Sequence, residues 1–194
     1  MRARSEDGFE YMSLDDFEDY LADKPANEKW ELLGGRVVKM MVGARWEHNR
    51  IVQNITTAMM VDFRRRGSDC RPFAETFYLK QRFMDLAALP DVMVRCGPLE
   101  KEATSLSDPT VLVEVASGGT ARRDRGEKWS LYKRLPSLQH YVIVARDEVA
   151  IDVLDRQGEG WLERPTISDP SALLTLPAIG FEMPVAEVYR DVLS

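Results

Sequence analysis

The sequence predicts an α/β or α+β domain in which helices flank a central mixed β-sheet. Two observations lead to this class. Short apolar segments with strand character alternate along the chain with segments whose apolar residues recur at the helical period. The chain has 194 residues, of which 44% are hydrophobic and 30% charged, and this size and composition suit one domain with a buried core.

The first third of the chain predicts a helix, a hairpin and a long helix. Residues 12–23 have a helical pattern in which Ser13 is the predicted N-cap, followed by acidic residues in the first turn. Residues 30–41 predict a hairpin around the glycine pair at 34–35. The long helix is expected over residues 48–66, where three arginines and Gly67 mark its end.

Strands dominate the rest of the chain. They are expected at residues 72–80, 91–96, 111–116, 139–145, 149–154 and 161–164. A loop is expected over 97–109, and two further helices over 121–135 and 183–193. We treat residues 1–194 as a single domain with an N-terminal helix and hairpin (12–42), a core (48–155) and a C-terminal strand and helix (156–194).

Composition narrows the function classes. The net charge of −6 argues against a protein that coats nucleic acid, although a nuclease with a locally acidic site remains compatible with it. Without an apolar run of roughly 20 residues or a signal-peptide core, we expect a cytoplasmic location and no membrane contact. Cys70 and Cys96 are expected to be reduced, partly buried thiols. The two cysteines and two histidines are too far apart in the sequence to have the paired spacing of a zinc site.

Two acidic residues lie inside segments that predict buried strands. Asp91 follows a proline in LPDVMV, and Glu114 lies within TVLVEVAS. A buried carboxylate is costly unless it is paired or binds a metal ion. On neighbouring strands the two carboxylates, together with the carbonyl of Val115, would suit Mg²⁺ or Mn²⁺ and hence phosphodiester hydrolysis.

A lysine on the following helix is a candidate third member of the site. Lys128 lies four residues after Asp124, and its helix face could point toward the two carboxylates, where an ammonium group would orient a water molecule or stabilise a phosphate. The alternative is a surface ion pair between Asp124 and Lys128. Trp129 and Tyr132 have the spacing of core residues on the same helix.

These residues resemble the PD-(D/E)XK superfamily, and within it the Uma family of bacterial endonucleases. The resemblance covers residues 12–155 and is carried by WELLGGRVVKMM, His48 opening a helix, LPDVMV, PTVLVEVASGGT, Asp124-x-x-x-Lys128-x-x-x-Tyr132 and QHYVIV. The superfamily places its lysine two residues after the glutamate, where this chain has Ala116. The resemblance implies that Lys128 takes this role, with Asp91 and Glu114 as metal ligands.

The resemblance also implies a restriction-endonuclease-like core, a DNA substrate, Mg²⁺ or Mn²⁺ as cofactor, no organic cofactor, and a homodimer. It suggests Glu31, His48 and Asp124 as accessory residues. Against this, Glu31 fits a solvent-facing hairpin and His48 fits an ordinary position at a helix start.

Two other functions compete with a DNA endonuclease. The first is a nuclease-like scaffold without catalysis that binds nucleic acid or a protein, which Ala116 and the acidic composition favour. The second is another hydrolase that uses Asp91 and Glu114 as general acid and base, although no aromatic-rich groove for a sugar is evident.

Overall fold

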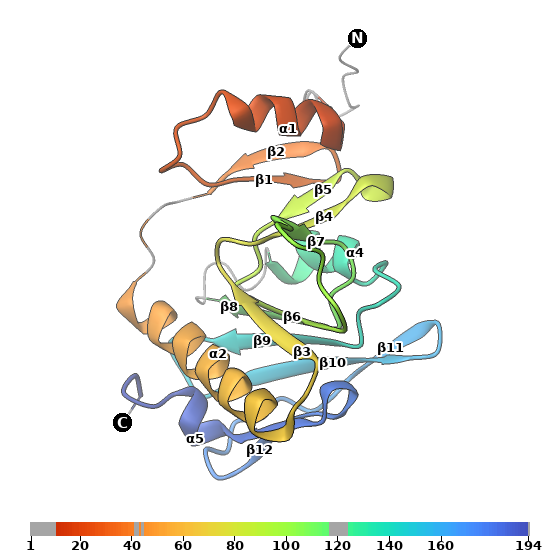
Figure 1. Ribbon diagram of the computed structural model, residues 1–194. Helices are drawn as coiled ribbons and strands as arrows, with labels where there is room; N and C mark the ends of the chain where they lie inside the picture. Colours follow the sequence, from red (N-terminus) through yellow and green to blue (C-terminus); the bar gives the residue numbers. More distant parts are fainter. Residues whose placement is uncertain (1–10, 41–42, 44, 117–123, 194) are drawn as a thin grey trace.

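The computed structural model describes residues 11–40, 43, 45–116 and 124–193 (Figure 1). Its helices are α1 (Leu14–Ala22), α2 (Trp46–Arg66), α4 (Trp129–Tyr132) and α5 (Val185–Val188). The largest sheet has six strands in the order β11 (Gly160–Glu163), β10 (Ile151–Gln157), β9 (His140–Ala145), β8 (Val111–Ala116), β6 (Val92–Cys96) and β3 (Cys70–Ala74).

Two smaller sheets complete the strands of the described chain. The five-stranded sheet has the order β2 (Arg36–Lys39), β1 (Trp30–Leu33), β5 (Leu86–Ala88), β4 (Tyr78–Gln81) and β7 (Ser105–Leu106), and β12 (Leu173–Leu176) pairs with β13 (Phe181–Pro184). The pairs β8–β9 and β4–β7 are parallel and their neighbours are antiparallel, so both larger sheets are mixed. This confirms the predicted mixed α and β class.

The six-stranded sheet is covered on both faces. In Figure 1, α2 crosses one face with α5 and β12 below it, and α4 lies behind the five-stranded sheet. On β8, Val113 and Val115 pack in the cluster that contains α2, whereas Leu112 and Ala116 pack in the cluster that contains α4. Glu114 lies between Leu112 and Ala116 on the same face of β8, so the strand directs its carboxylate toward α4.

The sequence signals for the N-terminal elements act as expected. Ser13 caps α1, since its hydroxyl accepts a hydrogen bond from the backbone N–H of Asp16 at 3.2 Å. Gly34 and Gly35 have φ of 59° and 86°, the left-handed values that the tight turn between β1 and β2 requires. Gly67 ends α2 with φ of 62°.

Several predictions differ from the structure: the loop expected over 97–109 contains β7, the strands β5 and β12 were not expected, and two elements have bounds far from those predicted. The single strand expected over 72–80 is two strands in different sheets, because the chain turns at Glu75, whose φ is 53°. The helix expected over 183–193 is reduced to α5, and β13 takes its first residues. Phe181 and Met183 are buried while Glu182 is exposed. This alternation has the two-residue period of a strand and explains why these residues do not continue a helix.

The segment before α4 is helical but irregular. Asp124–Lys128 forms a π-helical turn that runs directly into α4. Such turns widen the helix by one residue and are frequent at functional sites. The first residues of the helix expected over 121–135 lie outside the described residues, as does the side chain of Asp124.

The expectation of two reduced thiols is wrong. The structure joins Cys70 and Cys96 in a disulfide between β3 and β6. The two cysteines are 26 residues apart in sequence, but the antiparallel register places them directly opposite each other. Sequence spacing could not reveal this pairing, because it depends on which strands become neighbours.

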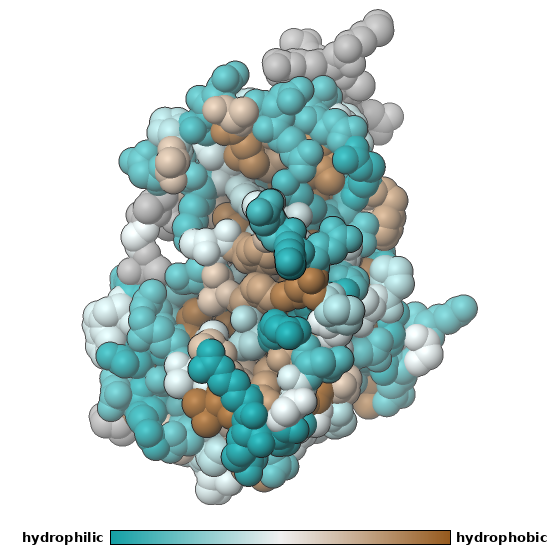
Figure 2. All heavy atoms as spheres, in the orientation of Figure 1, coloured by the Kyte–Doolittle hydropathy of each residue, from teal (hydrophilic) through white to brown (hydrophobic). Residues whose placement is uncertain are grey.

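The face shown in Figure 2 is mostly hydrophilic, with apolar residues gathered across its middle, between the upper and lower sheets. Within the described residues, none of the helices combines the length and apolar character needed to cross a membrane.

Candidate active site

Glu114 is the centre of a buried polar cluster. Its Oε1 atom lies 3.2 Å from Lys128 Nζ and accepts a hydrogen bond from the Tyr132 hydroxyl at 3.1 Å. Glu114 is 4% exposed, Lys128 6% and Tyr132 0%, so the ion pair is shielded from water. Lys128 is therefore buried and not the surface residue of the alternative interpretation, while the side chain of Asp124 lies outside the described part of the chain.

The N-terminal hairpin adds a second carboxylate to this cluster. Glu31 on β1 is 2% exposed, and its Oε1 atom lies 3.3 Å from Lys128 Nζ. The same oxygen accepts a hydrogen bond from the backbone N–H of Leu89 at 2.8 Å. Glu31 is thus an inward-facing residue and not the solvent-facing hairpin residue of the alternative interpretation.

An ion pair next to Lys128 ties the π-helical turn to the hairpin. The guanidinium group of Arg36 on β2 binds the carboxylate of Glu127. Because Glu127 immediately precedes Lys128, this contact helps to fix the turn from which the lysine extends toward Glu31 and Glu114.

Asp91 lies just before β6 and contacts β8 and α2. Its Oδ2 atom accepts a hydrogen bond from the backbone N–H of Val115 at 2.7 Å and lies 3.1 Å from His48 Nε2. Val92 pairs with Val113, so continuing the antiparallel register brings Asp91 beside Glu114. The structure therefore places Asp91, one residue before β6, beside Glu114 on the neighbouring strand β8, while their role as metal ligands stays a prediction.

Glu75 joins this group from the turn between β3 and β4. Its Oε1 atom lies 4.0 Å from His48 Nδ1. Ligand atoms from His48, Glu75 and Asp91 all lie within 4.8 Å of one another. Glu75 was not among the predicted site residues, because nothing in the segment around it marks a turn or a site.

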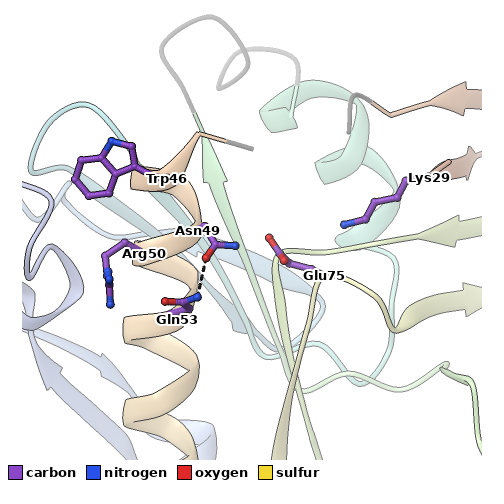
Figure 3. A pocket seen from close by; sticks show the side chains of 6 residues that line it. All are labelled: Lys29, Trp46, Asn49, Arg50, Gln53 and Glu75. Carbon is purple, nitrogen blue, oxygen red and sulfur yellow. Dashed lines mark hydrogen bonds between the residues drawn. The ribbon is translucent and has the colours of Figure 1, made fainter. Parts of the chain in front are cut away.

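An open cleft of about 440 Å³ lies beside Glu75 (Figure 3). Its lining residues are Lys29, Trp46, Asn49, Arg50, Gln53 and Glu75. Figure 3 shows Glu75 and Lys29 on one side of the first turns of α2, and Trp46 and Arg50 on the other. Trp46 is 59% exposed, which is unusual for a large aromatic side chain.

Two groups in the site have shifted pKa values. Burial, with the charges of Glu114 and Glu31, raises the pKa of Tyr132 well above its usual value, so this hydroxyl stays protonated and donates to Glu114. Burial lowers the pKa of His48, but the hydrogen bond and charge of Asp91 and the charge of Glu75 outweigh it, and the net shift is upward.

The chemistry of the donor set fits a divalent cation. Asp91 and Glu114 supply carboxylate oxygens from neighbouring segments, and such oxygens are the ligands that hard cations prefer. Tyr132 also belongs to the site although its spacing indicated a core residue; the Lys128-x-x-x-Tyr132 motif was the signal for it.

Comparison with known proteins shows two similar proteins from Synechocystis sp. strain PCC 6803. "Uncharacterized protein slr1290" is 30% identical over 176 residues, which cover 89% of this chain and 90% of that protein. "Uncharacterized protein sll1609" is 25% identical over 125 residues, which cover 63% of this chain and 69% of that protein.

A solved structure shares the fold. The crystal structure at 1.96 Å of "a putative nuclease belonging to DUF820" from Anabaena variabilis superposes with a TM-score of 0.75 and 17% identity. The match covers 94% of this chain and 99% of that one. The similarity confirms the restriction-endonuclease-like fold. The model of the Uma2 family, described as "Putative restriction endonuclease", matches residues 14–186, and the chain therefore belongs to this family.

Proposed function

We propose that this protein is a metal-dependent endonuclease that hydrolyses phosphodiester bonds in DNA. The observation that carries the proposal is the buried contact of 3.2 Å between Lys128 Nζ and Glu114 Oε1. This chain has Ala116 where the superfamily pattern has its strand lysine. The contact with Lys128 supplies an ammonium group to the same carboxylate from the following helix. Membership of the Uma2 family supports the nuclease class.

Asp91 and Glu114 would hold the Mg²⁺ or Mn²⁺ ion. When bound, such an ion lowers the pKa of a coordinated water and stabilises negative charge on a phosphate. The chain keeps the two carboxylates in place through neighbouring donors. Val115 N–H and His48 hold Asp91, while Tyr132 and Lys128 hold Glu114.

In the proposed reaction the oxygen of a water molecule attacks phosphorus and the bond between phosphorus and the leaving sugar oxygen breaks. The water releases a proton to solvent, and the leaving oxygen takes one up, so that one strand end carries a phosphate and the other a hydroxyl group. The ammonium group of Lys128 stabilises the negative charge that develops on the phosphate oxygens.

The cleft beside Glu75 is the proposed path of the DNA. Lys29 and Arg50 would contact phosphates, and the exposed indole of Trp46 would stack on a base. Glu75 connects this cleft to the site, because its carboxylate lies 4.0 Å from His48, which in turn lies 3.1 Å from Asp91.

A homodimer is part of the proposal, since cutting both strands of a duplex needs two sites. The outer strand β11 of the six-stranded sheet supports it, because Leu162 there is 48% exposed. Light scattering checks this: a dimer that Leu162→Lys converts to a monomer supports the interface, and a monomeric wild type contradicts it.

A plasmid-cleavage assay with Mg²⁺ or Mn²⁺ tests the function. Glu114→Gln keeps the size of the side chain and should abolish cleavage while the circular dichroism spectrum stays unchanged. Lys128→Ala should lower the rate by at least about a hundredfold. His140→Gln, which changes the other histidine of the chain away from this cluster, is the control. Wild-type rates in the Glu114 and Lys128 variants would reject the proposal.

One observation favours a scaffold without catalysis as the second candidate. Lys128 Nζ contacts both Glu31 and Glu114 at 3.3 and 3.2 Å, and such a shared ion pair would also serve a purely structural role. Calorimetric titration with Mn²⁺ separates the two functions. An endonuclease should bind Mn²⁺ in a manner that Glu114→Gln weakens, whereas a scaffold should show no Glu114-dependent binding.

A further inference from the structure

His48 has one ring nitrogen that the described residues leave without a hydrogen bond. Its Nδ1 atom is buried, and no hydrogen-bond partner for it is found among them. The other nitrogen, Nε2, lies 3.1 Å from Asp91 Oδ2. A buried imidazole nitrogen without a partner is unfavourable, so this arrangement calls for a ligand.

The nearest acidic group is too far away for a hydrogen bond. Glu75 Oε1 lies 4.0 Å from Nδ1, well beyond the roughly 3 Å of a hydrogen bond between these atoms. Two metal–ligand bonds of about 2.1 Å each, however, can span a separation of this size. The distance therefore suits a cation between the imidazole and the carboxylate better than a direct contact.

We propose that His48 Nδ1 and the Glu75 carboxylate hold a second cation, a divalent first-row transition-metal ion such as Mn²⁺ or Zn²⁺, while Asp91 orients the imidazole from its other nitrogen, Nε2. One ligand atom from each of these residues lies within 4.8 Å of the others. The imidazole distinguishes this site from the all-oxygen set around Glu114, because nitrogen ligands suit transition-metal ions whereas Mg²⁺ prefers oxygen.

The backbone holds these groups in place from three separate elements. Glu75 adopts a φ of 53°, a left-handed conformation that residues other than glycine rarely adopt. His48 extends from the first turn of α2, and the N–H of Val115 fixes Asp91 at 2.7 Å. Glu75 also lines the open cleft, which gives an ion a route from solvent.

The position of Asp91 links this site to the one proposed above. Asp91 contacts His48 on one side and the backbone next to Glu114 on the other. Asp91 would therefore orient the imidazole that holds the second ion, as outer-shell carboxylates do for metal-bound histidines, while it serves as a ligand in the proposed nuclease site. This linking role rests on the proposed function, whereas binding of the second ion does not.

Pulsed electron paramagnetic resonance on the Mn²⁺-loaded protein tests the inference, because it detects nitrogen bound to the ion. The wild type should show a histidine nitrogen signal that His48→Gln abolishes and that Glu75→Gln weakens. The chain has only two histidines, so His140→Gln is the matched control and should keep the signal. Absence of the signal from the wild type, or its survival in His48→Gln, would overturn the inference.

Glu114→Gln separates this inference from the proposed function. If both hold, the wild type binds two Mn²⁺ ions, and Glu114→Gln loses one of them but keeps the nitrogen signal. If only the second site exists, the wild type binds one ion with the nitrogen signal and cleaves no DNA. If only the proposed nuclease site exists, cleavage depends on Glu114 and the nitrogen signal is missing. Circular dichroism of each variant checks that the fold is intact.

Discussion

Lys128 Nζ lies 3.2 Å from Glu114 Oε1, although the two residues come from different elements and are 14 positions apart. Both are at least 94% buried. The lysine enters from a π-helical turn rather than from the strand that carries the glutamate. The position of an ammonium group beside this carboxylate is thus set by the fold and is not restricted to one spacing in the sequence.

Removal of the lysine charge should destabilise the protein. Lys128→Met removes a cation that contacts the buried carboxylates of Glu31 and Glu114, which should cost about 3–5 kcal/mol of the free energy of unfolding. Urea denaturation at pH 7 without metal ions measures this cost. The double variant Glu31→Gln/Lys128→Met should recover part of it, and additive losses in the two changes would contradict the ion-pair network.

Side chains of the cleft should contribute to DNA binding. Trp46→Ala should cost about 1–3 kcal/mol of binding free energy if the indole stacks on a base. Arg50→Ala should lower the slope of log affinity against log salt concentration by about one. Fluorescence anisotropy with labelled DNA and Ca²⁺ measures both effects. Arg65→Ala, at the other end of α2 where the side chain is 74% exposed, should change neither. An equal effect of Arg65→Ala would argue against the cleft.

His140 should make stability depend on pH. Its Nδ1 lies 2.7 Å from Asp155 Oδ1, and its Nε2 accepts a hydrogen bond from Ala178 N–H at 3.1 Å. Burial lowers the pKa of His140, although Asp155 acts in the opposite direction. The folded state therefore binds fewer protons than the unfolded chain, whose histidines titrate near about pH 6.5.

Because the folded state binds fewer protons, the stabilisation of the folded state by neutral His140 is fully present above about pH 6.5. It is lost as the pH falls toward the lower pKa of His140 in the folded state. His140→Gln removes the titrating group. The wild type should lose more unfolding free energy than His140→Gln between pH 7.5 and 5.5, as measured by urea denaturation. Parallel curves over this interval would show that His140 does not titrate differently in the two states.

The disulfide between Cys70 and Cys96 should stabilise the protein under oxidising conditions. It closes a segment of 26 residues, and such a link contributes about 2–4 kcal/mol by restricting the unfolded chain. Cys96→Ser should lose this amount when measured without reductant. With excess dithiothreitol the wild type and the variant should converge, and a difference that persists would assign the loss to packing instead.

The parts of the fold set by local periodicity were predictable. The long helix and its end at Gly67 follow from apolar spacing and a glycine with φ of 62°. Asp91 and Glu114 were identifiable because a carboxylate within an apolar strand is costly. Lys128 and Glu31 followed from family resemblance, and the structure brings both to one cluster, while their catalytic roles stay predictions.

Features that depend on tertiary neighbours were not predictable. Glu75 turns the chain without a glycine or proline, so no residue type marks the end of β3. The pairing of Cys70 with Cys96 depends on the register of two strands. The three-segment division within a single domain stays a prediction, although Glu31 and Lys128 come from different segments.

The position of Glu31 has a consequence for shortening the protein. β1 pairs with β5, and Glu31 on β1 contacts Lys128, which extends from the π-helical turn before α4. A fragment that starts at Trp46 would retain Asp91, Glu114 and Lys128 but would expose an unpaired edge and remove one of the two carboxylates around the ammonium group. The hairpin therefore cannot be removed as a separate extension when a shorter folded fragment is designed.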